Sequence, residues 1–131
     1  MHTGSCLCGA VKYEVRGEFQ QTLYCHCGRC RKASGSAFAT NAVAATNDFV
    51  VVQGKESLKD FSTPAGVHRY FCSNCGSPIL SSRDSVPGVV RVRVGSLDTP
   101  VTTPPSAHIF VGSKAVWWEI RDQLPQHAER P

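Results

Sequence analysis

The chain has 131 residues, a formal net charge of +4, 41% hydrophobic residues and 18% charged residues. This composition is typical of one globular domain with its own core, and it excludes a disordered chain. No apolar run approaches the roughly 20 residues of a membrane-spanning helix, and the first residues lack the pattern of a secretory signal. We therefore expect a cytoplasmic protein with reduced thiols and no membrane partner.

Along the chain, short apolar runs are separated by turn residues, a pattern that indicates short strands. Alternation of apolar and polar residues predicts strands at 10–16 and 88–95. Further short apolar runs predict strands at 36–44, 48–53, 67–72 and 107–112.

Helix is expected at only two places, for about a turn after Cys30 and around residues 117–124. The segment 125–131 is polar and ends in proline, so we expect a loose tail there. Without a linker or an internal repeat, residues 1–131 are predicted to form a single, mostly β domain.

Seven cysteines fall in three clusters of the form CxC, CxCxxC and CxxC. They are Cys6 and Cys8, then Cys25, Cys27 and Cys30, then Cys72 and Cys75. An odd number of cysteines in such tight clusters argues against a disulfide framework. Two alternatives are buried small hydrophobic residues and a redox CxxC motif, although no βαβ pattern surrounds the last pair. The spacing favours zinc.

Zinc geometry divides the seven cysteines into four and three. Structural sites have four protein ligands, whereas catalytic sites have three and leave one position open. We expect the CxC and CxxC pairs to meet in one closed structural site, because each pair supplies only half a tetrahedron. Gly9 and Gly76 follow these pairs and are expected to let the backbone turn tightly around the metal.

The remaining cysteines, Cys25, Cys27 and Cys30, predict a second zinc site with three thiolates. His26 is a possible fourth ligand, but in an extended CHC segment it points away from the face shared by Cys25 and Cys27. An open site is therefore favoured. An incoming thiol would complete it and be activated as a thiolate.

The chain resembles the glutathione-dependent formaldehyde-activating enzyme family, which includes the centromere protein V relatives. The resemblance covers nearly the whole chain and lies in GSCLCGAVKYEV, YCHCGRCRKASGSAF, YFCSNCGSPI and HIFVGSKAVWWEI. It implies a β-tent of twisted antiparallel sheets, a structural zinc on the four paired cysteines and a second zinc open to glutathione. It also implies carbon–sulfur lyase chemistry. Fold likeness alone does not fix this activity, because a non-enzymatic chaperone uses the same tent.

Glutathione carries carboxylates, so we expect positive charge close to the three-thiolate site. The candidate substrate-binding residues are Arg29, Arg31, Lys32, Ser34, Lys114 and Trp117. Each has a plainer alternative, as a surface cation, a turn hydroxyl or, for Trp117, a core aromatic. Among the catalytic candidates, His26 joins the three cysteines as the only plausible proton shuttle.

We expect a lyase-type protein with two zinc ions that forms or cleaves a thiohemiacetal of glutathione, or a similar thiol, with a small aldehyde such as formaldehyde. A glutathione carrier is one alternative, because formaldehyde adds to thiols without help. Another is a non-catalytic zinc module that binds protein or nucleic acid through its basic residues, which are the cluster of Arg29, Arg31 and Lys32 and the pair Arg91 and Arg93 on one strand face. Few aromatic residues near these charges and the near-neutral charge of the zinc-loaded chain argue against nucleic acid. The oligomeric state is left open.

Overall fold

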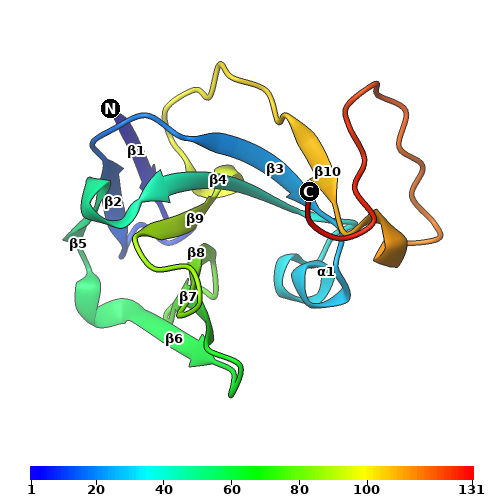
Figure 1. Ribbon diagram of the computed structural model, residues 1–131. Coiled ribbons are helices and arrows are strands. Elements are labelled where there is room, and N and C mark those ends of the chain that lie inside the picture. Colours follow the sequence, from blue (N-terminus) through cyan, green and yellow to red (C-terminus); the bar gives the residue numbers. More distant parts are fainter.

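Ten short strands and one α-helix make up the computed structural model, which describes residues 1–131 (Figure 1). The strands are β1 His2–Ser5, β2 Lys12–Val15, β3 Gln21–Cys25, β4 Ala39–Ala45, β5 Phe49–Gln53, β6 Leu58–Ser62, β7 Val67–Cys72, β8 Pro78–Arg83, β9 Val89–Arg93 and β10 Ala107–Ile109. The helix α1 spans Gly28–Ser34. Single 3₁₀ turns lie at Thr46–Asp48, Lys55–Ser57, Val94–Ser96 and Val111–Ser113.

The strands form two twisted sheets, so the prediction of a mostly β fold is confirmed (Figure 1). The smaller sheet has the order β1-β2-β5, and the larger one has the order β10-β3-β4-β9-β8-β7-β6. All strand pairs are antiparallel except β10 with β3, which is parallel. This exception to the expected antiparallel sheets is possible because the long connection after β9 lets the chain return in the direction of β3. No helix in the structure combines the length and the apolar character needed to span a bilayer.

The main core lies between the two sheets. Val11, Tyr13 and Val15 from the segment of β2 pack in one cluster with Val90 and Val92 of β9. The alternation of apolar and polar residues predicts one apolar face for each of these two segments, and the structure confirms it, because the four valines and Tyr13 are all buried. The opposite face of β9 therefore carries its arginines.

All six predicted strands overlap strands of the structure, whereas β1, β3, β6 and β8 were not predicted. The missed segments lack a clean period of two: β1 and β6 contain mostly polar residues, and β8 places buried residues consecutively. Helix α1 begins at Gly28, before Cys30, and ends as expected within a turn of it.

The helix predicted around residues 117–124 is wrong, because this segment forms turns. Lys114 Nζ donates to the carbonyl oxygens of Ala115 and Trp118, and Asp122 accepts from the backbone N–H of Leu124. Local side-chain bonds thus replace the backbone bonds that a helix would make.

The C-terminal segment differs from the loose tail that the sequence suggested. Five backbone hydrogen bonds join residues 125–129 to residues 108–112, including His127 N to His108 O at 2.9 Å and Phe110 N to Glu129 O at 2.9 Å. The C-terminal segment therefore runs beside the end of β10, next to the larger sheet (Figure 1).

Candidate metal centre and adjacent cavities

The CxC and CxxC pairs, far apart in the sequence, meet in space as a four-cysteine site. Cys8 Sγ lies 3.6 Å from Cys6 Sγ and 3.9 Å from Cys72 Sγ, and Cys75 completes the group. A tetrahedral zinc with Zn–S bonds of about 2.3 Å requires sulfurs about 3.8 Å apart. The spacing of these sulfurs therefore fits a closed zinc site.

Two glycines shape the loops of this site. Gly9 has φ +80° and Gly76 has φ +79°, a region that favours glycine. Their backbone N–H groups donate to Cys6 O at 3.1 Å and Cys72 O at 2.7 Å, which closes a tight turn around each pair. The prediction for both glycines is confirmed.

Hydrogen-bond donors surround the sulfurs of the four-cysteine site. Asn74 Nδ2 lies 3.2 Å from Cys8 Sγ, and its hydrogen bond lowers the pKa of the Cys8 thiol. Ser77 Oγ lies 3.2 Å from Cys75 Sγ, and hydrogen bonding from Ser77 lowers the pKa of the Cys75 thiol to about 5. These donors favour the thiolates that a zinc ion needs.

The other three cysteines form a three-cysteine site where β3 passes into α1. Cys25 ends β3, Cys27 is the N-cap of α1, and Cys30 lies in the first turn of the helix. Cys25 Sγ and Cys30 Sγ are 3.2 Å apart, and all three sulfurs lie within 4.8 Å of one another. This group fits a metal ion with three protein ligands.

Hydrogen bonds within the three-cysteine site favour the thiolate form of one cysteine, Cys27. Hydrogen bonds from Cys25 and Cys30 hold the pKa of the Cys27 thiol far below its ordinary value, whereas the same contacts raise the pKa of Cys25. Cys27 Sγ also accepts the backbone N–H of Cys30 at 3.2 Å. Because Cys27 is only half-buried while the other two are buried, the thiolate lies on the accessible side.

His26 does not join Cys25, Cys27 and Cys30 as a potential metal ligand. Its ring is fully buried and its Nε2 lies 2.8 Å from His108 Nδ1, whose Nε2 lies 2.9 Å from Asp122 Oδ2. Burial, followed by repulsion from His108, lowers the pKa of His26 to about 4, so the ring is neutral at pH 7. The side chain points away from the thiols, as the extended CHC segment predicts.

Of the basic residues predicted to bind substrate, two are exposed to solvent and two donate hydrogen bonds to backbone carbonyl groups. Arg29 and Lys32 are exposed on α1, whereas Arg31 donates to Ser113 O at 3.1 Å and joins the helix to the turn after β10. Lys114 is engaged with backbone carbonyls next to it. Trp117 is 69% exposed, so its alternative role as a core aromatic is wrong.

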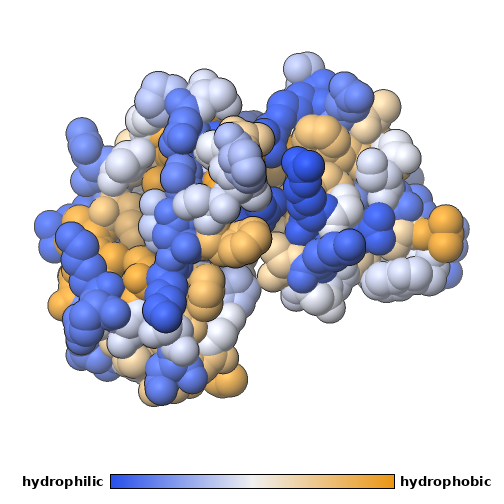
Figure 2. All heavy atoms as spheres, turned by 90° about the horizontal axis from the view of Figure 1, so that it is seen from below, coloured by the Kyte–Doolittle hydropathy of each residue, from blue (hydrophilic) through white to orange (hydrophobic).

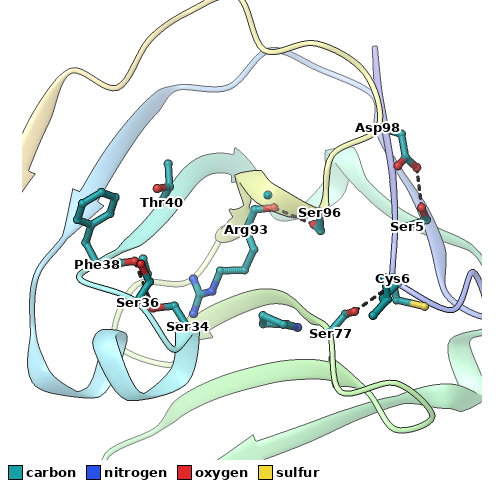
Figure 3. A pocket seen from close by; sticks show the side chains of 14 residues that line it. Ser5, Cys6, Ser34, Ser36, Phe38, Thr40, Ser77, Arg93, Ser96 and Asp98 are labelled. Atoms are coloured by element: carbon teal, nitrogen blue, oxygen red, sulfur yellow. Dashed lines mark hydrogen bonds between the residues drawn. The ribbon is translucent and has the colours of Figure 1, made fainter.

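A groove lined by hydroxyl groups lies between the Cys6 loop and α1 (Figure 3). It has a volume of about 650 Å³. Its hydroxyl-bearing residues are Ser5, Ser34, Ser36, Thr40, Ser77 and Ser96. Ser34 is the one predicted substrate residue that lines this hydroxyl groove, and Arg93 crosses the middle of the view (Figure 3).

A second, smaller cavity adjoins the three-cysteine site on the arginine-bearing face of the larger sheet. It has a volume of about 30 Å³, and Cys25 and Cys30 form part of its wall. Its charged lining residues are Arg69, Arg83, Arg91, Arg93 and Arg130, with no Asp or Glu among the lining residues. Seen from below, hydrophilic residues border the hollow between the two lobes of the molecule (Figure 2).

The sequence drew attention to only two arginines of this arginine cavity, through the alternation of Arg91 and Arg93 in β9. Arg69 and Arg83 come from β7 and β8, where strand pairing places Ser81 beside both Arg69 and Arg91. Arg130 comes from the C-terminal segment. Only the strand order brings these residues together, so no local motif could have indicated them.

Comparison with known proteins fixes the family. The family described as glutathione-dependent formaldehyde-activating enzyme matches residues 1–113, which include all seven cysteines. The chain belongs to this family. A Halomonas elongata protein named after the glutathione-dependent formaldehyde-activating enzymes is 32% identical over 129 residues, which cover 92% of this chain and 81% of that protein. The crystal structure of a Rhodobacter sphaeroides protein, a structural genomics target, is similar with a TM-score of 0.65 and 31% identity, over 76% of this chain and 91% of that one.

Proposed function

We propose that the chain is a carbon–sulfur lyase that forms or cleaves the thiohemiacetal of glutathione, or a similar thiol, with a small aldehyde such as formaldehyde. Membership of the glutathione-dependent formaldehyde-activating enzymes supports this chemistry at the level of the family. The observation that carries the proposal is the three-cysteine site, in which three sulfurs converge while the adjacent His26 is turned away. Such a donor set leaves one position for a ligand from outside.

Zinc bound by Cys25, Cys27 and Cys30 would offer an open position to a soft thiol and lower the pKa of that thiol. The chain itself contributes the accessible side of the site, where Cys27 is half-buried, and a fold that keeps Cys25 and Cys30 out of water. We assign the second proposed zinc to the four-cysteine site, where it would hold the fold together.

The hydroxyl groove is the proposed seat of the thiol substrate. Its volume of about 650 Å³ falls in the range of pockets that bind small molecules. Ser34 and Ser36 line it from the end of α1 and the loop that follows. The hydroxyl group of Ser36 could donate to a peptide carbonyl of a tripeptide thiol, whereas Ser34 Oγ already donates to Cys30 O at 2.8 Å and could only accept. Arg93 lines both this groove and the arginine cavity, which supports a continuous binding site for an anionic thiol.

His26 was predicted as a proton shuttle, and its surroundings support a positioning role in the proposed mechanism. Its Nε2 is occupied by His108, and its Nδ1 is buried without a partner. The addition forms one C–S bond, and the carbonyl oxygen of the aldehyde then takes a proton. We propose that water in the open groove supplies this proton.

Exchange spectroscopy by NMR tests the proposal. With glutathione and formaldehyde at equilibrium, zinc-loaded protein should accelerate exchange between free glutathione and its hydroxymethyl adduct, and Cys27→Ser should not. Binding of glutathione by calorimetry without faster exchange would assign the chain to the carrier alternative. Absence of both binding and acceleration in folded, zinc-loaded protein would contradict the proposed function.

Nucleic-acid binding is the weaker candidate. The paired arginines of β9 that suggested it point into a cavity, and Arg93 is 7% exposed. A duplex backbone needs cations on an accessible surface, and these residues do not provide one.

A further inference from the structure

Five guanidinium groups converge on the arginine cavity, which lies beside the three-cysteine site. The residues come from β7, β8, β9 and the C-terminal segment, so the cavity is built by the tertiary fold. Guanidinium groups stay protonated in proteins, and like charges close together repel one another. Such an arrangement costs stability unless an anion compensates it.

Protein groups do not provide the compensation. The lining residues include no carboxylate, and no salt bridge involves any of the five arginines. Three thiolates around one Zn²⁺ would carry a net charge of about −1, which balances only one of the five cations. At least one further anionic group is therefore expected in the cavity.

Three buried N–H groups of these arginines also lack partners. Arg93 is more than nine-tenths buried, and its guanidinium donates through one nitrogen to Asn41 Oδ1 and to Ser81 Oγ at 3.2 Å. Its Nε has no partner, and neither has Arg69 Nε or Arg91 Nη1. Since buried donors without acceptors are costly, these groups indicate an acceptor that binds in the cavity.

The size and shape of the cavity point to a carboxylate. A volume of about 30 Å³ has room for roughly two water-sized groups. A planar carboxylate matches this space and pairs with two guanidinium groups through parallel N–H···O bonds. We propose that the arginine cavity binds a substrate carboxylate beside the three-cysteine site.

This inference extends the proposed function to the class of substrate. Formaldehyde has no charge and does not need the arginines. The carboxylate belongs either to the thiol, as in glutathione, or to the carbonyl compound, which would then be a small oxo acid. Both sources share the same chemistry at the cavity, and separate measurements distinguish them.

The binding test uses malonate and its neutral analogue malonamide, titrated by calorimetry into zinc-loaded full-length protein. Malonate should bind, and Arg91→Met and Arg83→Met should each weaken it at least about tenfold. Arg130→Met should weaken malonate binding too. Because Arg130 is exposed, this substitution does not disturb the buried core. The matched control Arg16→Met removes an exposed cation directly after β2 that pairs with Glu14, and it should leave malonate binding unchanged.

Equal binding of malonate and malonamide, or equal binding of malonate to all variants, would overturn the proposal. Cys27→Ser should keep malonate binding while losing adduct chemistry. If the proposed lyase function is wrong, malonate should still bind to the arginine cavity. If the carboxylate site is wrong, malonate binding through these arginines should be absent.

The source of the carboxylate follows from two comparisons. If the thiol carries it, wild-type protein should bind glutathione diethyl ester as weakly as Arg91→Met binds glutathione. If the carbonyl compound carries it, Arg91→Met should slow adduct formation with glyoxylate and keep the rate with formaldehyde. An Arg91→Met variant that matches wild type in both comparisons would contradict a substrate role for the cavity.

Discussion

Cys27 combines three roles in one side chain. It caps the N-terminus of α1, it holds the thiolate of the three-cysteine site, and it is the accessible member of that group. The first role is shared by serine, which is a favoured N-cap residue, whereas the second requires sulfur. Substitutions at this position can therefore separate folding from metal binding.

We predict that Cys27→Ser keeps the fold and α1, loses one zinc per chain and loses glutathione binding. Cys27→Ala should show the same losses. Its free energy of unfolding should also be about 1 kcal/mol lower than that of Cys27→Ser, because alanine cannot accept the N-cap hydrogen bond from Cys30 N. Zinc analysis, calorimetry and chemical denaturation measure the three effects. Full zinc content and glutathione binding in Cys27→Ser would show that the thiolate is not a ligand.

Tyr13 illustrates a residue whose protonation is set by the core. Its hydroxyl lies 2.6 Å from Ser96 Oγ, and burial raises the pKa of the phenol to about 12. The folded state thus holds the proton more tightly than the unfolded chain, whose pKa is about 10. The stabilising effect of the protonated phenol is complete below pH 10 and is lost as the pH rises from 10 through 12.

We predict that the free energy of unfolding falls by about 2 kcal/mol between pH 10 and pH 12 because of Tyr13. Tyr13→Phe should be less stable than wild type at pH 8, since the hydrogen bond between Tyr13 and Ser96 is lost while Ser96 still donates to Arg93 O, and its stability should decline less steeply in alkali. Urea denaturation across this pH range is the measurement. Parallel declines for both proteins would contradict the account.

At the scale of elements, a chain of hydrogen bonds connects three segments. His26 follows β3, His108 lies in β10, and Asp122 lies in the segment 117–124, before the C-terminal segment. The chain ties the loop that carries Cys25 and Cys27 to the end of the molecule. It therefore fixes the position of the loop from the side opposite the sulfurs.

We predict that His108→Ala lowers the free energy of unfolding by about 1–3 kcal/mol, since it leaves His26 Nε2 buried without a partner. Asp122→Asn should cost less, because an amide oxygen can still accept from His108. His26→Ala should keep both zinc ions, with weaker retention of the one bound by the three cysteines. Loss of this zinc in His26→Ala at saturating metal would indicate that His26 is itself a ligand.

How far the sequence predicts these elements depends on the range of the interactions. The alternation in β9 and the CxC, CxCxxC and CxxC spacings are local, so they indicated strands and the grouping of cysteines into four and three. The helix expected around 117–124 is absent because Lys114 bonds to the carbonyl oxygen of Trp118 and Asp122 to the backbone N–H of Leu124, which are groups that a helix would use. The arginine cavity depends on strand order and on the docking of Arg130, which no local pattern contains.

For the whole molecule, the four-cysteine site joins the loop after β1 to the loop after β7. Cys6 and Cys72 are both buried within the main core cluster, so metal and core stabilise the same region. Zinc bound there would close a long segment of chain, and its binding would be coupled to folding.

We predict that Cys72→Ser abolishes folding of the whole domain, since a structural zinc contributes about 10–16 kcal/mol, as much as the usual net stability of about 5–15 kcal/mol. A strong chelator should first remove the zinc of the three-cysteine site without unfolding, and then the other zinc together with the fold. Circular dichroism recorded with zinc release gives the order. A Cys72→Ser protein with the melting temperature of wild type would refute a structural role.

The central claim is that glutathione completes the three-cysteine site through its sulfur. X-ray absorption at the zinc edge counts the sulfur ligands directly. In protein with two zinc ions, one with four thiolates and one with three, the average should be about 3.5 sulfurs per zinc and should rise to about 4 with glutathione. S-methylglutathione, which cannot form a thiolate, should leave it near 3.5. A sulfur count that glutathione does not change would contradict the claim.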